Sequence, residues 1–281
     1  MRPLSLNDLP IYTPWVERLL NARTNTLFEK TRSSIYREYE TDKWAAIWSD
    51  IQSRRLSLDE IESLQFDGKE EIAISMRSEL YLAAPIEARK VLAALVADKV
   101  SVFHEPGSTV AELGAGTGAI IARIAKDRRF VGSEFAAADF SHSSIKVIDY
   151  VARAEGVSIR TGLFDFHSET NEFRLSAGCT LVFSFTMAYI QGLDEKFWTR
   201  LAATNPGAMV IAEPIYQFYG GKSVLGLLRR RYYEANEYNK EILPSIEDAE
   251  RNGFVAVTGV EENVIGINPL CPVSLISLRF K

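Results

Sequence analysis

Cysteine is scarce in this 281-residue sequence, which holds only Cys179 and Cys271. Both lie in apolar segments, so we expect reduced thiols, as is usual in the cytoplasm, and no disulfide framework. Long apolar runs are also missing, because the longest one, residues 181–190, is interrupted by polar side chains and is too short to cross a bilayer. The first ten residues lack the apolar stretch of a signal peptide. We therefore expect a cytoplasmic protein with no membrane partner.

Positive charge is not in excess either. The chain has 32 Lys and Arg against 37 Asp and Glu, a formal net charge of −5, and its one strong basic cluster is residues 229–231. Nucleic acid is therefore not an expected partner. The three histidines are scattered with no cysteine or carboxylate at ligand spacing, so we expect no metal site. With 47% hydrophobic residues the chain is long enough to bury its own core, but its oligomeric state stays open.

The N-terminal third of the chain has a helical pattern. Thr41-Asp42 is predicted to begin a helix with an apolar face, and Ser57 with Glu60 matches a capping box. Residues 86–102 predict a long apolar helix. Since no strand pattern interrupts this part, we expect residues 1–105 to form a helical extension.

After Pro106-Gly107, short apolar runs alternate with helical stretches. Continuous apolar strands separated by helices are typical of a parallel sheet covered on both faces, so residues 106–281 predict a doubly wound α/β domain. The last two strands are joined without a helix, which favours an antiparallel pair. The predicted strands are 109–113, 130–134, 157–161, 180–185, 208–213, 254–260 and 273–279.

A glycine-rich turn lies between the first of these strands and the next helix. Gly114, Gly116 and Gly118 have the spacing G-x-G-x-G, which differs from the G-x-G-x-x-G of dinucleotide binders. Glycine permits a tight turn and a close approach of the backbone to a ligand, although glycines that only relieve a strained turn fit the pattern too. The carboxylate of Glu112 would repel a pyrophosphate and suits a ligand with an ammonium and a sulfonium.

Two further acids follow predicted strands. Glu134 is expected at the end of the second strand, where nucleoside-binding α/β proteins hold the ribose hydroxyls, and Phe135 beside it is able to pack on adenine. Asp165-Phe166 follow the third strand, where a carboxylate can accept a hydrogen bond from the adenine amino group. Singly, each acid fits a helix cap or a solvated loop. Together, at adjacent strand ends, they predict a site for a nucleoside sulfonium.

Residues 112–118 (Glu-Leu-Gly-Ala-Gly-Thr-Gly), 132–135 (Gly-Ser-Glu-Phe) and 164–166 (Phe-Asp-Phe), with the seven strands, resemble a class I S-adenosylmethionine (SAM)-dependent methyltransferase. The resemblance covers about residues 90–281. It implies a Rossmann-like sheet of order 3-2-1-4-5-7-6 and SAM as the cofactor. Many members have Asp in place of Glu112, so a direct or a water-mediated contact with the ammonium stays open. The cofactor-binding residues it implies are Glu112, Gly114, Ala115, Gly116, Gly118, Glu134, Phe135, Asp165, Phe166 and Ser184.

The ends of the fourth and fifth strands provide the candidate catalytic residues. Tyr189 lies just beyond the fourth strand, which faces the sulfonium in this fold, and aromatic rings attract cations. Glu213 ends the apolar fifth strand, where a carboxylate needs a partner or a ligand. If the acceptor must lose a proton, Tyr189, Glu213 or His142 is the candidate base. The Asn/Asp-Pro-Pro-Tyr/Phe motif of amino-group DNA methyltransferases is absent, which counts against chemistry on flipped bases.

Five polar or aromatic residues are candidates for binding the substrate. Tyr232, Asn236 and Asn239 share one face of a predicted helix, and turned inward they would fix a small polar molecule. A solvated helix is the alternative. Tyr36 and Tyr39 belong to an aromatic cluster in the extension, which the resemblance suggests is a lid over the site. Packing between helices is the alternative for that cluster.

Residues 213–216 (Glu-Pro-Ile-Tyr), the polar run 229–239 and residues 268–270 (Asn-Pro-Leu) are similar to bacterial tailoring enzymes for amino acids and oxo acids. That subgroup includes enzymes that methylate a guanidino oxo acid and relatives that cyclise SAM to azetidine-2-carboxylate. The sequence therefore predicts a biosynthetic methyltransferase acting on a small polar metabolite, or a cyclase that releases methylthioadenosine. A SAM-binding module without turnover and a nicotinamide dehydrogenase are the remaining alternatives.

Overall fold

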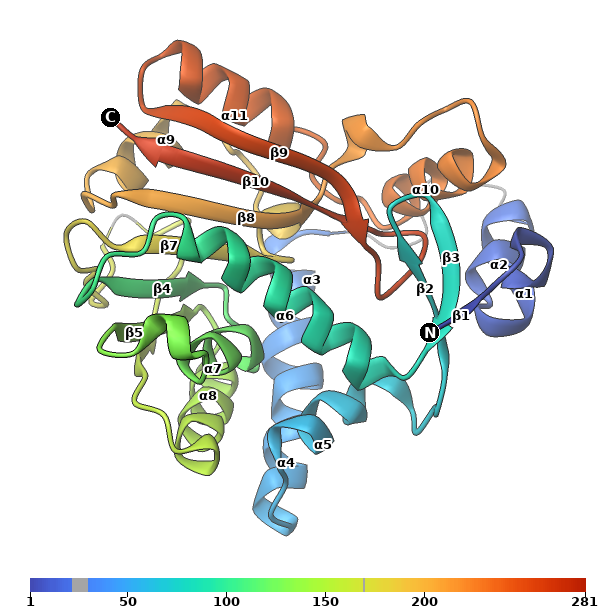
Figure 1. Cartoon of the computed structure of the whole chain (residues 1–281), viewed down its shortest axis with the longest axis horizontal. Coiled ribbons are helices and arrows are strands. Elements are labelled where there is room, and N and C mark those ends of the chain that lie inside the picture. The colour runs from blue at the N-terminus through green and yellow to red at the C-terminus, as the bar shows by residue number, and fades with distance from the viewer. Residues whose placement is uncertain (22–29, 169) are drawn as a thin grey trace.

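The computed structural model describes residues 1–21, 30–168 and 170–281. Within these residues the larger sheet contains β4 (Thr109–Leu113), β5 (Glu134–Asp139), β6 (Arg160–Leu163), β7 (Thr180–Ser184), β8 (Ala208–Pro214), β9 (Val255–Ile265) and β10 (Val273–Phe280). Their spatial order is β6-β5-β4-β7-β8-β10-β9 (Figure 1). The neighbouring strands β6, β5, β4, β7 and β8 pair in parallel in that spatial order. β10 lies antiparallel between β8 and β9. Numbered along the chain this order is 3-2-1-4-5-7-6, so the predicted fold class is confirmed.

Helices cover both faces of this sheet (Figure 1). One face packs against α6 (Pro85–Ser101), α7 (Ala119–Ala125) and α8 (His142–Glu155), and the other against α9 (Glu195–Ala202) and α11 (Ile242–Arg251). Because both faces are buried, the central parallel strands β7 and β8 are largely apolar, whereas the outer strand β6 (Arg160–Leu163) is partly exposed.

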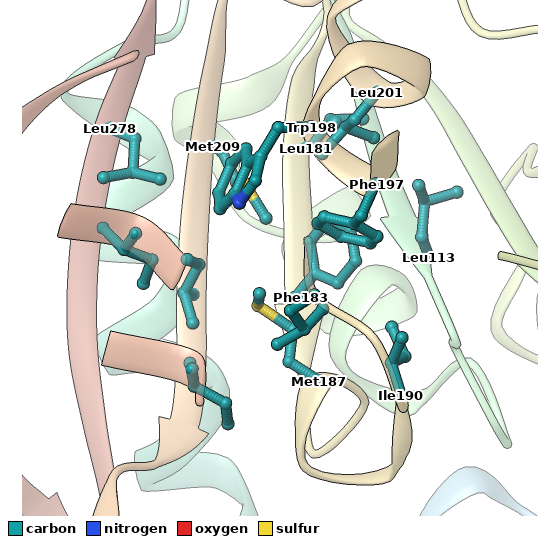
Figure 2. Packing of buried hydrophobic residues seen from close by; sticks show 14 of the residues in the cluster. Leu113, Leu181, Phe183, Met187, Ile190, Phe197, Trp198, Leu201, Met209 and Leu278 are labelled. Atoms are coloured by element: carbon teal, nitrogen blue, oxygen red, sulfur yellow. The ribbon is translucent and has the colours of Figure 1, made fainter. Parts of the chain in front are cut away.

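Alternate side chains of each central strand enter opposite halves of the core. Leu181 and Phe183 of β7 face the α9 layer, whereas Val182 packs in the α6 layer. Figure 2 shows Met209 of β8 beside Trp198 and Phe183 of β7 beside Phe197, and both partners belong to α9. The indole nitrogen of Trp198 donates a hydrogen bond to the Ser245 hydroxyl at 2.7 Å. This packing fixes the strand ends, which carry the candidate site.

The N-terminal helices are α1 (Leu9–Tyr12), α2 (Trp15–Asn21), α3 (Arg32–Tyr36), α4 (Ala45–Ser53) and α5 (Leu58–Ser63), and α10 (Val224–Ala235) lies beside α2. The capping box at Ser57 and Glu60 is confirmed. The helix predicted to begin at Thr41 begins instead at the N-terminus of α3, because a π-helical stretch, Arg37–Trp44, joins α3 to α4. The helical prediction for residues 22–29 lies outside the described residues. No described helix is long and apolar enough to span a bilayer.

The expectation of a wholly helical extension is wrong at residues 72–83. A small antiparallel sheet of order β1-β3-β2 is formed by β1 (Arg2–Pro3), β2 (Ile72–Met76) and β3 (Glu79–Ala83). β2 is buried along most of its length, so it lacks the polar alternation that identifies a half-exposed strand. Ser75 also forms a two-way backbone hydrogen-bonded bridge with Gly266, at 2.9 and 2.8 Å. The small sheet is thereby joined to the end of β9.

Candidate functional site

The glycine loop connects the carboxyl end of β4 to the start of α7. Gly114, Gly116 and Gly118 all have positive φ angles, of 72°, 56° and 71°. A Cβ atom on Gly114 would lie 2.4 Å from side-chain atoms of Thr186, and one on Gly116 would lie 3.0 Å from the ring of Trp44. The loop therefore needs glycine both for its backbone conformation and because neighbouring side chains pack directly against it.

Glu112 is buried just before the loop, with 3% of its surface exposed. Its carboxylate accepts a hydrogen bond from the backbone N–H of Ile121, in the first turn of α7, at 3.1 Å. Burial raises the pKa of Glu112 to about 8. A cation beside this carboxylate would favour its charged form, and this is the electrostatic setting predicted for an ammonium group.

Glu134 and Phe135 do not reach the loop, and their predicted place at a strand end is wrong. Residues 128–130 form a 3-10 turn and Gly132 has a φ of 87°, so the strand begins at Glu134 instead of ending there. Glu134 pairs with Thr109 at the start of β4, and Phe135 packs in the core beside the α6 layer. In parallel strands the starts lie at the edge opposite the glycine loop.

The acid at the carboxyl end of β5 is Asp139, which is 4% exposed. Its carboxylate accepts hydrogen bonds from the backbone N–H groups of Gly116, at 2.9 Å, and Ser141, at 3.0 Å. Burial raises the pKa of Asp139 to about 6, against the lowering effect of these hydrogen bonds. The alanine run 136–138 followed by the helix N-cap Ser141 is the sequence signal that marks this strand end.

Two adjoining cavities, of about 860 and 780 Å³, lie beside the glycine loop. We call them the larger and the smaller cavity. The smaller one is lined by Asp139, Phe140, Asp165 and Phe166, among others. The larger one is lined by Glu112, Ala115, Gly116, Ser184 and Tyr232, among others. Both are lined by Tyr39, Trp44, Gly114, Phe185 and Tyr189.

Residues 30–44, which we call the roof, extend over the smaller cavity. Arg32 pairs with Asp165, and Tyr36 lines the cavity beside Phe140. At one end of the roof, the backbone N–H of Lys30 donates to the Glu237 carboxylate at 3.1 Å. At the other end the roof continues into α4, whose apolar face packs on α7 and α8. The roof is thus attached to the body of the protein at both ends.

Tyrosine rings gather where the two cavities meet. The Tyr189 ring lies 5.2 Å from that of Tyr39 and 5.3 Å from that of Tyr238, and its hydroxyl is 3.4 Å from the Tyr238 hydroxyl. Tyr232 lines the larger cavity and packs edge-on against Trp15. Burial raises the pKa of Tyr189 to about 12, so its hydroxyl stays protonated near neutral pH and acts as a hydrogen-bond donor.

Besides Glu134 and Phe135, the predicted site residues Gly118, His142, Asn236 and Asn239 line neither cavity. α10 ends at Ala235, so the helical face on which the two asparagines were predicted does not continue. The amide group of Asn236 donates to the backbone oxygen of Tyr232 at 2.8 Å, and that of Asn239 donates to the oxygen of Ile190. His142 is exposed in the first turn of α8.

Glu213 is fully buried and, as expected, has partners, but these are backbone groups. It accepts hydrogen bonds from the N–H of Thr186, of Met187 at 2.9 Å and of Ala188 at 3.3 Å. Burial raises the pKa of Glu213 to about 7. Glu213 lines neither cavity, so its position does not favour the predicted role of base. It shapes the turn after β7 that carries Tyr189.

Comparisons with known proteins support the fold. No family model matches the chain, and no curated protein matches it. Among solved structures, magnesium protoporphyrin IX methyltransferase (ChlM) from Synechocystis PCC 6803 with bound SAH matches with a TM-score of 0.51 and 12% identity, over 89% of this chain and 100% of that one. The [4+2]-cyclase SpnF matches with a TM-score of 0.50 and 15% identity, over 69% and 81%. The chain therefore has the fold of class I SAM-dependent methyltransferases.

The packing of the glycine loop is testable with two alanine substitutions. Gly156 also has a positive φ, of 68°, but a Cβ there would meet nothing within 4 Å. We expect Gly156→Ala to lower the free energy of unfolding by about 1–2 kcal/mol, which is the cost of the left-handed backbone. Gly114→Ala should lower it by roughly 1–3 kcal/mol more, because its methyl group overlaps Thr186. Urea unfolding measures both, and equal losses would contradict the close contact.

The role of Glu213 is testable by Glu213→Ala. Three buried backbone N–H groups would lose their acceptor, so we expect the free energy of unfolding to fall by about 3 kcal/mol or more. Glu247→Ala, on the exposed side of α11, is the control and should change it by less than about 1 kcal/mol. If Glu213 were a base, the variant would instead keep its stability and lose turnover.

Proposed function

We propose that the two cavities bind SAM and that the protein transfers the methyl group of SAM to a small polar metabolite of the amino acid or oxo acid type. The observation that carries this proposal is the position of the glycine loop, Asp139 and Asp165. They follow the adjacent strands β4, β5 and β6 and line two cavities that share Gly114. In open α/β sheets, ligands bind at the carboxyl ends of the strands where the strand order reverses, and β4 is at that point here.

The smaller cavity suits the adenosine part of SAM. Asp139 takes the role that the sequence assigned to Glu134, because it is the carboxylate at the end of the second strand of the fold. Each Asp139 oxygen accepts one backbone hydrogen bond and keeps a lone pair for a ribose hydroxyl. Asp165 and Phe166 supply an acceptor and an aromatic ring for adenine.

The larger cavity suits the methionine part of SAM and the acceptor. Glu112 would hold the ammonium group, and the positive charge would offset the cost of ionising this buried carboxylate. Tyr39 and Tyr189 line the junction of the two cavities, where their rings would attract a sulfonium.

The chain's own contribution to methyl transfer is positioning and exclusion of water. SAM supplies an activated methyl group when bound. The roof covers the smaller cavity, and Trp44 packs over Gly116 at the junction, so the reacting groups would be held apart from bulk water. The extension formed by residues 1–105 acts in this proposal as the lid of a SAM-binding domain formed by residues 106–281.

A second candidate reaction uses the same site. Because Trp44 lies on the glycine loop, the aminobutyrate arm of SAM would be confined under an aromatic side chain. Confinement of that kind favours attack of the arm's own amine on its γ carbon, which forms azetidine-2-carboxylate and releases methylthioadenosine. The two reactions differ in whether an acceptor is needed.

Binding is tested by titrating S-adenosylhomocysteine into the purified protein in a calorimeter. Asp139→Asn removes the carboxylate charge at the ribose position, and we expect it to weaken binding by about tenfold or more. Glu134→Gln is the matched control and should bind like the wild type, because Glu134 lies at the other edge of the sheet. Equal affinities for all three proteins, or a loss only in Glu134→Gln, would contradict the proposed site.

The reaction is tested by mass spectrometry of the nucleoside product. We expect incubation with SAM to yield S-adenosylhomocysteine only when an amino acid or oxo acid acceptor is added. Methylthioadenosine formed from SAM alone would instead establish the cyclase reaction. Binding of SAM without either product, whichever amino acid or oxo acid is added, would show a SAM-binding module that does not turn over.

A further inference from the structure

Two arginines line the wall of the larger cavity formed by α5, α6 and α7. Arg89 comes from α6 and Arg123 from α7, and both side chains line the cavity together with Glu62 of α5. Arg123 donates a hydrogen bond to the buried Glu62 carboxylate. The Arg89 Nε atom lies 3.9 Å from the same carboxylate. Two guanidinium groups therefore share one buried negative charge.

The two arginines differ in their other partners, because Arg123 has a second carboxylate and Arg89 has none. Asp59 lies 2.8 Å from Arg123, but its side chain is 45% exposed and it also pairs with Lys90 at 3.1 Å. The remaining partners of Arg89 are neutral: the side-chain oxygen of Gln65, at 3.0 Å, and the ring of Phe66, 5.5 Å from the guanidinium carbon. Burial lowers the pKa of Arg89, and the nearby charge of Arg123 lowers it further, while Glu62 acts in the opposite direction. Arg89 thus has no carboxylate of its own, because the one nearest to it is also hydrogen-bonded to Arg123.

Both arginines also have an unused hydrogen-bond donor. The Nε–H groups of Arg89 and Arg123 are buried and have no hydrogen-bond acceptor. A buried donor without an acceptor is unfavourable, and most proteins avoid it. A ligand carboxylate beside the cavity-lining guanidinium of Arg89 would supply the hydrogen-bonded negative partner that this side chain lacks.

We propose that Arg89 and Arg123 form a carboxylate-binding subsite in the larger cavity. The planar guanidinium group offers two parallel donors that match the two oxygens of a carboxylate. Glu62 and Asp59 already balance much of the positive charge here, so a single negative charge fits better than a dianion such as a phosphate. The bound carboxylate would belong either to the aminobutyrate arm of SAM or to the acceptor, and in this respect the inference rests on the proposed function.

The experiment compares the whole wild-type chain with Arg89→Gln and with Arg129→Gln as control. Arg129 is an exposed arginine paired with Asp98 and Asp127, and it lines neither cavity. Arg89 is chosen because Arg123 also balances Glu62, so its removal would leave a buried carboxylate unpaired. The probes are S-adenosylhomocysteine, methylthioadenosine, which lacks the amino acid arm, and pyruvate and alanine added to the protein saturated with S-adenosylhomocysteine.

If the carboxylate belongs to SAM, Arg89→Gln should bind S-adenosylhomocysteine about tenfold or more weakly and methylthioadenosine as the wild type does. If it belongs to the acceptor, affinity for pyruvate or alanine should fall by a similar factor while affinity for S-adenosylhomocysteine stays the same. Arg129→Gln should match the wild type in each titration. Arg89→Lys keeps the charge without the planar fork, so it should recover only part of the lost affinity.

A structural role for Arg89 predicts a different result. Arg89→Gln would then lower the melting temperature of the ligand-free protein and leave the affinity for every carboxylate probe unchanged. That outcome would overturn the proposed subsite. A wild-type protein that binds neither S-adenosylhomocysteine, pyruvate nor alanine would overturn it too. A wild-type protein that binds pyruvate or alanine but neither nucleoside would instead contradict the proposed function alone, and Arg89→Gln would still decide the subsite.

Discussion

Hydrogen bonds from backbone N–H groups to buried carboxylates hold the whole site together. Asp139 binds Gly116 in the glycine loop, Glu112 binds Ile121 at the start of α7, and Glu213 binds the turn after β7. Each carboxylate lies in or at the end of a strand that is fixed by the core. The loops beside the cavities are therefore positioned by the sheet, and the side chains they carry need little further ordering when a ligand binds.

Burial gives these carboxylates a second property. The pKa values of Glu112, Asp139 and Glu213 are raised to about 8, 6 and 7, because the low-polarity surroundings disfavour the charged forms. A positively charged ligand next to Glu112 would relieve that cost, whereas a pyrophosphate would add to it. In the proposed function, the buried carboxylate of Glu112 would therefore favour the ammonium group of SAM over an anionic ligand.

Sequence patterns predict the sheet well where both hydrophobic pattern and turn chemistry agree. β4 was predicted with the bounds that the structure has, and the glycine loop follows it as expected. Glu134 was misplaced because residues 130–134 have a strand-like composition, although Gly132 turns the chain there. Residues 72–76 were missed because a fully buried strand has no alternation. The arginine pair could not be predicted, since Arg89 and Arg123 meet only through the packing of three helices.

The attachment of the roof at both ends bears on the size of molecule that can react here. Lys30 is hydrogen-bonded to Glu237 at one end, and α4 is packed on α7 and α8 at the other. In the proposed function, a small metabolite suits this arrangement better than a polymer, because the segment over the smaller cavity is held to the body of the protein at both ends.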